Sequence, residues 1–338
     1  MLYEYMLELG LNDKEIKLII DRYGLLRYNE EILYNKLKSN YEYLLEIGYK
    51  KDEIKNFLFE SIFLFTYGVS VIEKKINNLI NLGYSMDEIK KMGIKHQAIF
   101  WLGIDNINMK RELFIEIGFS DKEINIMTIK YPMMYSLNSD TINGKINYLI
   151  ELGYSNENIV KMIRNMPEIL SLSLDTIKTK YDELMNLGYS KKQVIIMTSN
   201  HSALYSLSIN YIKNKLNELL KLGFDIDDII KMTVKFPSLY SLSIDNIKRK
   251  KEFYDMVGLT NVMILEPKYI MQSVELSYAR YMFCRNIGLN IDMSNYRILF
   301  MGQVQFNKRF GINNEQVINI YNYNEHLENR DIKIKVRS

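Results

Sequence analysis

The chain has little of what catalytic, metal-binding and disulfide-rich proteins need. Its 338 residues include one cysteine, three histidines and one tryptophan. A single cysteine, Cys284, excludes an internal disulfide framework and suits a reducing compartment. The histidines are scattered, so no Cys/His cluster has metal-ligand spacing, and no Gly-rich phosphate loop is present. We therefore expect a protein that is not an enzyme, with no catalytic residue, metal or cofactor.

A membrane span and a leader are lacking as well. The most apolar stretch, residues 61–72, lies between Glu60 and Glu73 and is shorter than the ~18 residues that a span needs. Residues 1–10 carry two glutamates and no basic residue, unlike a targeting peptide. We expect no membrane contact and favour a cytoplasmic, bacterial-type, nucleoid-associated location. A mitochondrial location would apply if a leader had been removed.

What the chain does have is a repeat. Nine of its sixteen glycines share one position, and the seven central ones are 35 residues apart: Gly10, Gly48, Gly83, Gly118, Gly153, Gly188, Gly223, Gly258 and Gly288. The four prolines share a second position, at Pro132, Pro167, Pro237 and Pro267. His96-Gln97 and His201-Ser202 stand where other units have a residue followed by proline. Recurrence at a fixed period of this length indicates a repeat protein.

Each unit has the signals of two helices. In residues 154–188, Ser155 is a natural N-cap, and the first helix should end before Pro167. In other units an acidic or amide residue three positions after the cap can complete a capping box. Ser173 can cap the second helix, and Gly188 can end it with a positive φ.

The second helix carries an apolar stripe at helical spacing, formed by Ile177, Tyr181 and Leu184. The sequence therefore predicts an all-α solenoid of ~35-residue helix-turn-helix repeats, with helix boundaries recurring from residue 49 to 258 and no strand there. We assign residues 1–288 to about eight repeats and residues 289–338 to a capping segment and tail. Residues 333–338 should be disordered.

The repeat can be written Leu-Gly-Tyr-Ser-x-x-x-Ile-x-x-Met-x-x-x-x-Pro-x-x-Leu-Ser-Leu-Ser-x-x-x-Ile-x-x-Lys-x-x-x-Leu. It resembles the repeat of the mitochondrial transcription termination factor (mTERF) family, from about Gly10 to Gly288. The segment from Pro267 to Glu275 is similar to the closing block of that family, and Arg280 lies where the block usually ends in Pro-Arg. The resemblance implies two α-helices and a short 3₁₀ turn per unit, in a superhelix that holds nucleic acid along a basic groove.

Lysines follow the same period, independently of that resemblance. One row is spaced at 35 residues near the start of the second helices: Lys75, Lys110, Lys145, Lys180, Lys215 and Lys250. A second, partial row is formed by Lys178, Lys213 and Lys248, and Arg249 extends it. Acidic residues instead open the first helices, where they complement the helix dipole. A basic row at a fixed pitch suits a phosphate backbone, so we expect these side chains, and Arg280 from the resemblance, to contact nucleic acid with exposed ammonium groups.

The lysine row has a second interpretation, and most aromatic residues are expected in the core. Lys180 borders the stripe of Ile177, Tyr181 and Leu184, so its stem could simply cover apolar surface while the ammonium group stays solvated. Most aromatic residues occupy repeated positions that should be core, such as the residue after each glycine, and we nominate no base-stacking residue.

The sequence favours a monomeric protein that binds double-stranded DNA and acts in transcription regulation or termination. Its binding could be specific for sequence or tolerant of it. RNA is the alternative nucleic acid, because helical repeats also hold single strands. A protein-interaction scaffold without nucleic acid is the alternative from another class.

Overall fold

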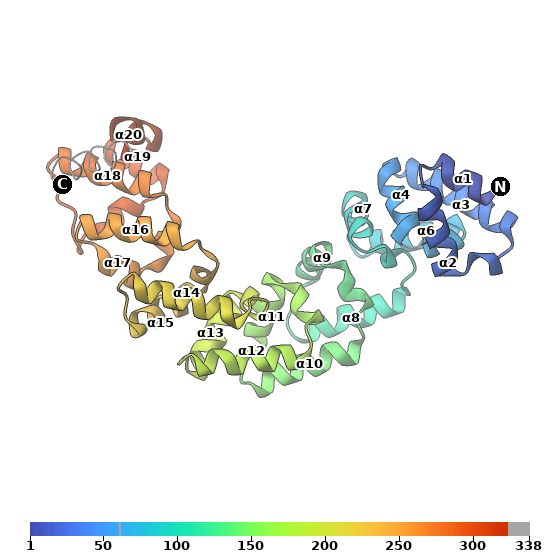
Figure 1. Ribbon diagram of the computed structural model, residues 1–338, viewed down its shortest axis with the longest axis horizontal. Coiled ribbons are helices and arrows are strands. Elements are labelled where there is room, and N and C mark those ends of the chain that lie inside the picture. Colours follow the sequence, from blue (N-terminus) through green and yellow to red (C-terminus); the bar gives the residue numbers. More distant parts are fainter. Residues whose placement is uncertain (61, 324–338) are drawn as a thin grey trace. The chain divides into compact units, whose positions relative to one another are not determined.

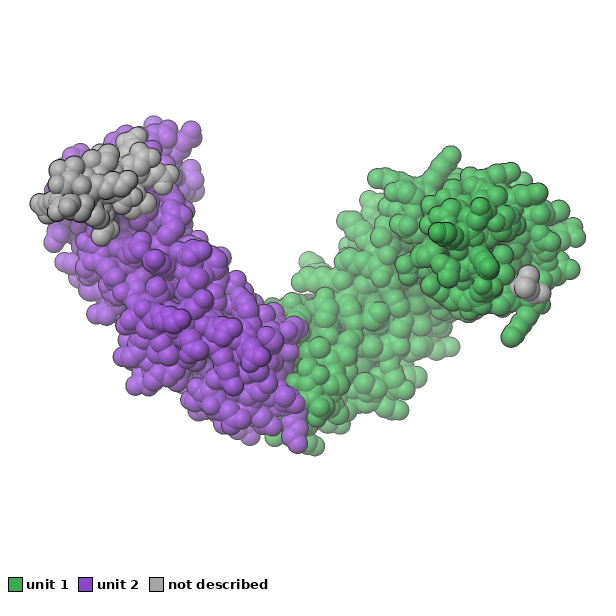
Figure 2. Space-filling model, viewed as in Figure 1, with its two compact units in different colours: residues 1–176 green, residues 177–338 purple. Residues whose placement is uncertain are grey.

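The computed structural model describes residues 1–60 and 62–323, and every regular element among them is a helix. Twenty α-helices and eight 3₁₀-helices follow one another along this part of the chain (Figure 1). The chain forms two compact units, residues 1–176 (unit 1) and residues 177–338 (unit 2), shown in separate colours in Figure 2. The prediction of an all-α repeat solenoid is confirmed.

The first helices of the repeats begin at a constant interval. Their starting residues from α4 to α15 are 35 positions apart, as the glycine spacing predicted. The final unit is shortened, and its first helix α17 has 6 residues where those from α4 to α15 have 10. These helices are α2 (Asp13–Tyr23), α4 (Lys51–Glu60), α7 (Met86–Lys95), α9 (Asp121–Lys130), α11 (Asn156–Asn165), α13 (Lys191–Asn200), α15 (Ile226–Lys235) and α17 (Thr260–Leu265).

The second helices keep the same interval from α6 to α16 and carry the lysine rows. They are α1 (Leu2–Glu8), α3 (Glu30–Glu46), α6 (Val69–Asn81), α8 (Ile104–Glu116), α10 (Ser139–Glu151), α12 (Leu174–Asn186), α14 (Ile209–Lys221), α16 (Ile244–Met256) and α18 (Val274–Asn286). The boundary between the two compact units falls within α12.

Short helical turns join the first helix to the second in each repeat. They are η1 (Leu25–Arg27), α5 (Phe63–Thr66), η2 (Gln97–Phe100), η3 (Pro132–Ser136), η4 (Pro167–Ser171), η5 (Ser202–Tyr205), η6 (Pro237–Ser241) and η7 (Pro267–Met271). Met166, before Pro167, leaves helical geometry at φ −143° and ψ 83°, and His201, with no proline after it, does so at φ −144° and ψ 76°. The turn therefore forms with or without proline.

Glycine ends the second helices as predicted. All nine glycines of the repeat position have positive φ, which is 92° at Gly153. There the Gly153 amide donates to Ile150 O at 2.8 Å and the Tyr154 amide donates to Leu149 O at 3.0 Å. This pair of bonds satisfies carbonyls that the end of α10 would otherwise leave free, and it requires a left-handed residue between them.

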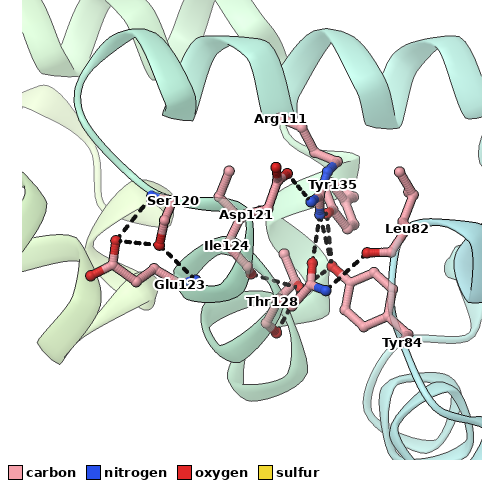
Figure 3. Close-up of polar contacts among 10 residues, drawn as sticks. Leu82, Tyr84, Arg111, Ser120, Asp121, Glu123, Ile124, Thr128 and Tyr135 are labelled. Atoms are coloured by element: carbon pink, nitrogen blue, oxygen red, sulfur yellow. Dashed lines mark hydrogen bonds and ion pairs between the residues drawn. The ribbon is translucent and has the colours of Figure 1, made fainter.

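Serine begins four of the first helices, α7, α9, α11 and α13, and Asp225 begins α15, as predicted. In α9 the Ser120 hydroxyl accepts from the Glu123 amide, and the Glu123 carboxylate accepts from the Ser120 amide at 2.9 Å (Figure 3). Ser85 with Glu88 and Ser190 with Gln193 form the same capping box. Ser173 caps the second helix α12 through a 3.0 Å bond from the Thr176 amide.

Each unit has its own apolar core, to which the repeated aromatic residues belong. The residue after each glycine, from Tyr49 to Phe224, is buried, as are Tyr135, Leu170, Tyr205 and Tyr240. The prediction that these positions are core is confirmed.

After Gly288, the chain forms η8 (Tyr296–Phe300), α19 (Gln303–Phe310) and α20 (Asn314–Ile320). Leu299, Phe306 and Val317 of this segment join the core of unit 2. The division into a solenoid of residues 1–288 and a capping segment of residues 289–338 stays a prediction, and residues 333–338 lie outside the described part.

Candidate nucleic-acid interface

The lysine row with the unbroken 35-residue spacing is mostly buried, which corrects the expectation that its ammonium groups are exposed. The exposed fractions of Lys110, Lys145, Lys180, Lys215 and Lys250 lie between 1% and 7%. Lys75 on α6 is half-buried. Five of the six lysines that we expected to contact phosphates are therefore covered by protein.

Three of these buried lysines donate hydrogen bonds to backbone carbonyls in or next to the turn of the following repeat. In unit 1, Lys110 on α8 donates to Tyr135 O of η3 at 2.5 Å, and Lys145 on α10 donates to Leu170 O of η4. In unit 2, Lys215 on α14 donates to Leu242 O, just after η6, at 2.7 Å. Burial lowers the pKa of Lys110 and Lys145 below the usual lysine value. Each of these lysines fastens one repeat to the next.

The other two buried lysines lack a carbonyl partner of this kind. Lys180 on α12 donates to the Glu183 carboxylate at 2.8 Å. Lys250 on α16 has no hydrogen-bond partner, and burial lowers its pKa to about 7.

The position of this row on the second helix explains its burial. Lys180 is three residues after Ile177 and four before Leu184, so it points from the middle of the apolar stripe rather than from its edge. The sequence contained this signal in the helical spacing. It could not show that the next repeat offers a carbonyl to the buried ammonium group.

The second lysine row is exposed, as expected. Lys178, Lys213 and Lys248 lie at the same position of α12, α14 and α16, and all three belong to unit 2. We call them the unit-2 basic row. Arg249 follows the last of them, and its guanidinium donates to the Glu275 carboxylate of α18 at 2.7 Å. That ion pair lies at the surface, with side-chain exposures of 49% and 34%.

The unit-2 basic row lies close to the N-termini of its helices. The Ser208 hydroxyl caps α14 and the Ser243 hydroxyl caps α16. A helix N-terminus carries a partial positive charge, so its dipole and the lysine one turn further along attract the same anion. The helices α14 and α16 also pack against each other, which brings their basic residues to neighbouring positions.

Arg280, expected from the resemblance to bind nucleic acid, is instead fully buried. Its guanidinium on α18 donates to Leu299 O at 2.9 Å, to Met301 O at 2.6 Å and to Asn314 Oδ1 at 2.7 Å. It also lies 4.2 Å from the centre of the Phe306 ring. Burial lowers its pKa to about 10. These contacts hold the segment after Gly288 against α18, and they explain the correction.

A buried arginine that the sequence analysis missed joins two repeats of unit 1. Arg111 on α8 forms an ion pair with Asp121 and donates to Asn125 Oδ1 at 2.7 Å (Figure 3). It also donates to the hydroxyls of Tyr84 and Tyr135, at 3.4 and 3.3 Å. The repeated tyrosine positions were a partial signal, because buried hydroxyls need partners. The equivalent Tyr189 and Tyr240 of unit 2 bond each other at 2.5 Å.

The described residues were also compared with the requirements of a metal site, a membrane span and a small-molecule cavity. Within residues 1–60 and 62–323, no group of three or more His, Cys, Asp or Glu residues is placed to hold a metal ion. None of the helices in this part of the chain combines the length and apolar composition that crossing a bilayer requires. Unit 1 has a cavity of about 370 Å³ beside Trp101, His96 and Lys95, and none of the predicted contact residues lines it.

Comparison with known proteins agrees with this repeat architecture. No curated protein matches the chain. The family model named mTERF matches residues 2–117, 105–218 and 135–307, which together extend over most of the chain. Members of that family are helical-repeat proteins that generally bind nucleic acid. From the glycine spacing, the paired helices with their 3₁₀ turns and these three overlapping matches, we conclude that the chain belongs to the mTERF family.

Proposed function

We propose that the protein binds double-stranded DNA as a monomer through the unit-2 basic row, and that it acts in transcription regulation or termination rather than in catalysis. The observation that carries this proposal is the exposure of Lys178, Lys213 and Lys248 at one position of successive second helices. Neighbouring packed helices lie about 8–10 Å apart, so the row presents cations at a regular pitch.

Such a row favours binding that tolerates sequence. Lysine meets phosphate as a point charge, and phosphates carry no direct information about the bases. Each phosphate contact on duplex DNA changes the slope of log K against log salt by about −0.9, so three lysines contribute about −2.7. Five of the six lysines in the other row are buried, so they add no phosphate contact to this contribution.

The test is the salt dependence of binding by the wild type and two triple variants. Replacing Lys178, Lys213 and Lys248 by Ala should make the slope for duplex DNA shallower by about 2.7 units. A matched control removes the same charge from exposed lysines of unit 2 outside the row, with Lys191, Lys192 and Lys221 replaced by Ala. We expect the control to keep most of the wild-type slope. Equal slopes for the two variants would contradict the assignment of the row.

The choice of nucleic acid is tested by competition between duplex DNA, single-stranded DNA and RNA of matched length. We expect duplex DNA to compete best. Preferential binding of RNA would replace DNA in the proposal. Binding to none of the three would overturn it in favour of a protein-interaction scaffold.

A further inference from the structure

Lys250 differs from the other lysines of its row in having a buried amine without a partner. Its exposed fraction is 1%, and its Nζ has no hydrogen-bond partner. Lys110 and Lys145 each reach a turn carbonyl 25 residues further along the chain. In the shortened last repeat the residue 25 positions after Lys250 is Glu275 on α18, and no carbonyl reaches the amine.

The neighbours of Lys250 place it beside a surface ion pair. Glu275 favours the protonated amine, whereas Arg249 disfavours it, and these two residues also bond each other at 2.7 Å. On α16 the Tyr254 hydroxyl, one turn after Lys250, is likewise buried without a partner.

The helices α14 and α17, which also pack on α16, have one carboxylate between them, Glu218, and it forms an ion pair with Lys215. Residues 260–265 of α17 contain no titratable side chain, and Lys215 of α14 is already bonded to Leu242 O. Glu275 is therefore the carboxylate that both Arg249 and a protonated Lys250 would use.

We propose that proton uptake by Lys250 draws Glu275 away from Arg249, and that the released guanidinium then contacts phosphate beside Lys248. The inference rests on the proposed function and adds its regulation by pH. A charged amine in a dry environment needs a counterion, and Glu275 can supply one from α18. When Lys250 is protonated, Arg249 therefore acts as a fourth cation beside the unit-2 basic row.

Burial brings this equilibrium into the physiological range, because it lowers the pKa of Lys250 to about 7. Above that pH the amine is neutral and Glu275 stays paired with Arg249. Below it the amine is charged and competes for the carboxylate. The expected gain in affinity on acidification is about fivefold, at the lower end of typical couplings between sites.

The experiment measures binding of a duplex of ~20 base pairs at about pH 6 and about pH 8.5, over a series of salt concentrations. The wild type should bind more tightly at the lower pH, with a slope steeper by about 0.9, one additional phosphate contact. Lys250→Met should bind equally at both pH values. Glu275→Gln should bind tightly at both, because Arg249 is then free throughout. His201→Gln, which removes a titrating ring of unit 2 outside this group, should behave as the wild type does.

A second readout follows the titration without nucleic acid. The unfolded chain keeps its lysine proton up to the ordinary pKa of 10.5, whereas folded Lys250 loses it near 7. The unfolded state therefore binds more protons in this window, and stability should rise as the pH increases from 7 toward 10.5. Lys250→Met should lack this part of the rise in Tm.

The outcomes separate the inference from the proposed function. A wild-type acid effect that persists in Lys250→Met would overturn the inference and leave the binding proposal intact. A wild type that binds duplex DNA equally at both pH values would do the same. Failure of the wild type to bind any nucleic acid would remove the proposed function and the inference with it.

Discussion

At the scale of single residues, the buried lysines that share one position in the repeat differ in their hydrogen-bond partners. Lys145 bonds the Leu170 carbonyl, Lys180 bonds Glu183, and Lys250 has no partner. The difference comes from the segment that the next repeat brings against the amine and, for Lys180, from Glu183 three residues further along the same helix. Burying an ammonium group is costly unless it is hydrogen-bonded, and the partner therefore decides whether the lysine stabilises its repeat.

This contrast predicts opposite effects of the same substitution. Lys145→Met should lower the free energy of unfolding by about 1–2 kcal/mol, because a buried charge-assisted bond is lost. Lys250→Met should raise it at pH 7, because the substitution removes an unpartnered buried amine. Urea unfolding monitored by circular dichroism measures both, and the exposed Lys178→Met is the control, within about 0.5 kcal/mol of the wild type. Destabilisation by Lys250→Met would contradict this account.

The glycine position makes a second prediction at this scale. Gly153 has φ 92°, a conformation that β-branched residues strongly disfavour. Gly153→Val should cost on the order of 1–2 kcal/mol or more and lower Tm. Gly144, in the interior of α10, is the control, because a Cβ there meets nothing within 4 Å. Equal melting temperatures for Gly153→Val and Gly144→Val would show that the left-handed backbone conformation does not disfavour valine at position 153.

At the scale of elements, the segment after Gly288 depends on one buried side chain. Arg280 bonds Leu299 O, Met301 O and Asn314, which joins α18 to η8 and α20. The segment therefore has a polar attachment in addition to Leu299, Phe306 and Val317 in the core.

Removal of that attachment should loosen these elements first. We expect Arg280→Met to cost about 2 kcal/mol, because carbonyls bonded by the guanidinium lose their donor. Amide hydrogen exchange should accelerate in residues 296–320 more than in α16, since elements open as cooperative units. The control is Arg297→Met, which removes a side chain that is 71% exposed in the same segment. Uniform acceleration along unit 2 would indicate that Arg280 supports the whole unit instead.

At the scale of the whole molecule, net charge is a poor guide to the proposed partner. The chain has a net charge of +3, yet exposed lysines share one position on three second helices of unit 2. Asp227 and other acids open the first helices, while Asp245 lies in the first turn of α16, close to Lys248. Binding should therefore depend on where a charge lies rather than on the total.

Two neutralising substitutions test this dependence on position. Asp245→Asn and Asp227→Asn each raise the net charge by one, and both aspartates are exposed. Asp245→Asn should strengthen duplex DNA binding about threefold, since it removes a negative charge close to the unit-2 basic row, whereas Asp227→Asn should change it little. Equal effects of the two substitutions would show that only total charge matters.

The repeat architecture followed from the sequence by itself. Glycine at the end of each second helix, a serine or other polar cap at the start of most first helices and the apolar stripe act through contacts within a few residues, so a local pattern determines them. The helix starts at 35-residue intervals and the burial of the aromatic positions were predicted for this reason.

Which partner each buried cation meets was decided only by the tertiary structure. Lys178 and Lys180 are two residues apart on α12, yet one is exposed and the other buried, because side chains two positions apart point to nearly opposite sides of a helix. The helical spacing does not give the contact that the following repeat makes with a buried amine such as that of Lys145. Lys145, Lys250 and Arg280 depend in the same way on partners 19 to 34 residues away or on their absence. Such partners come together only when the repeats stack, so the pairing had to be found in the fold.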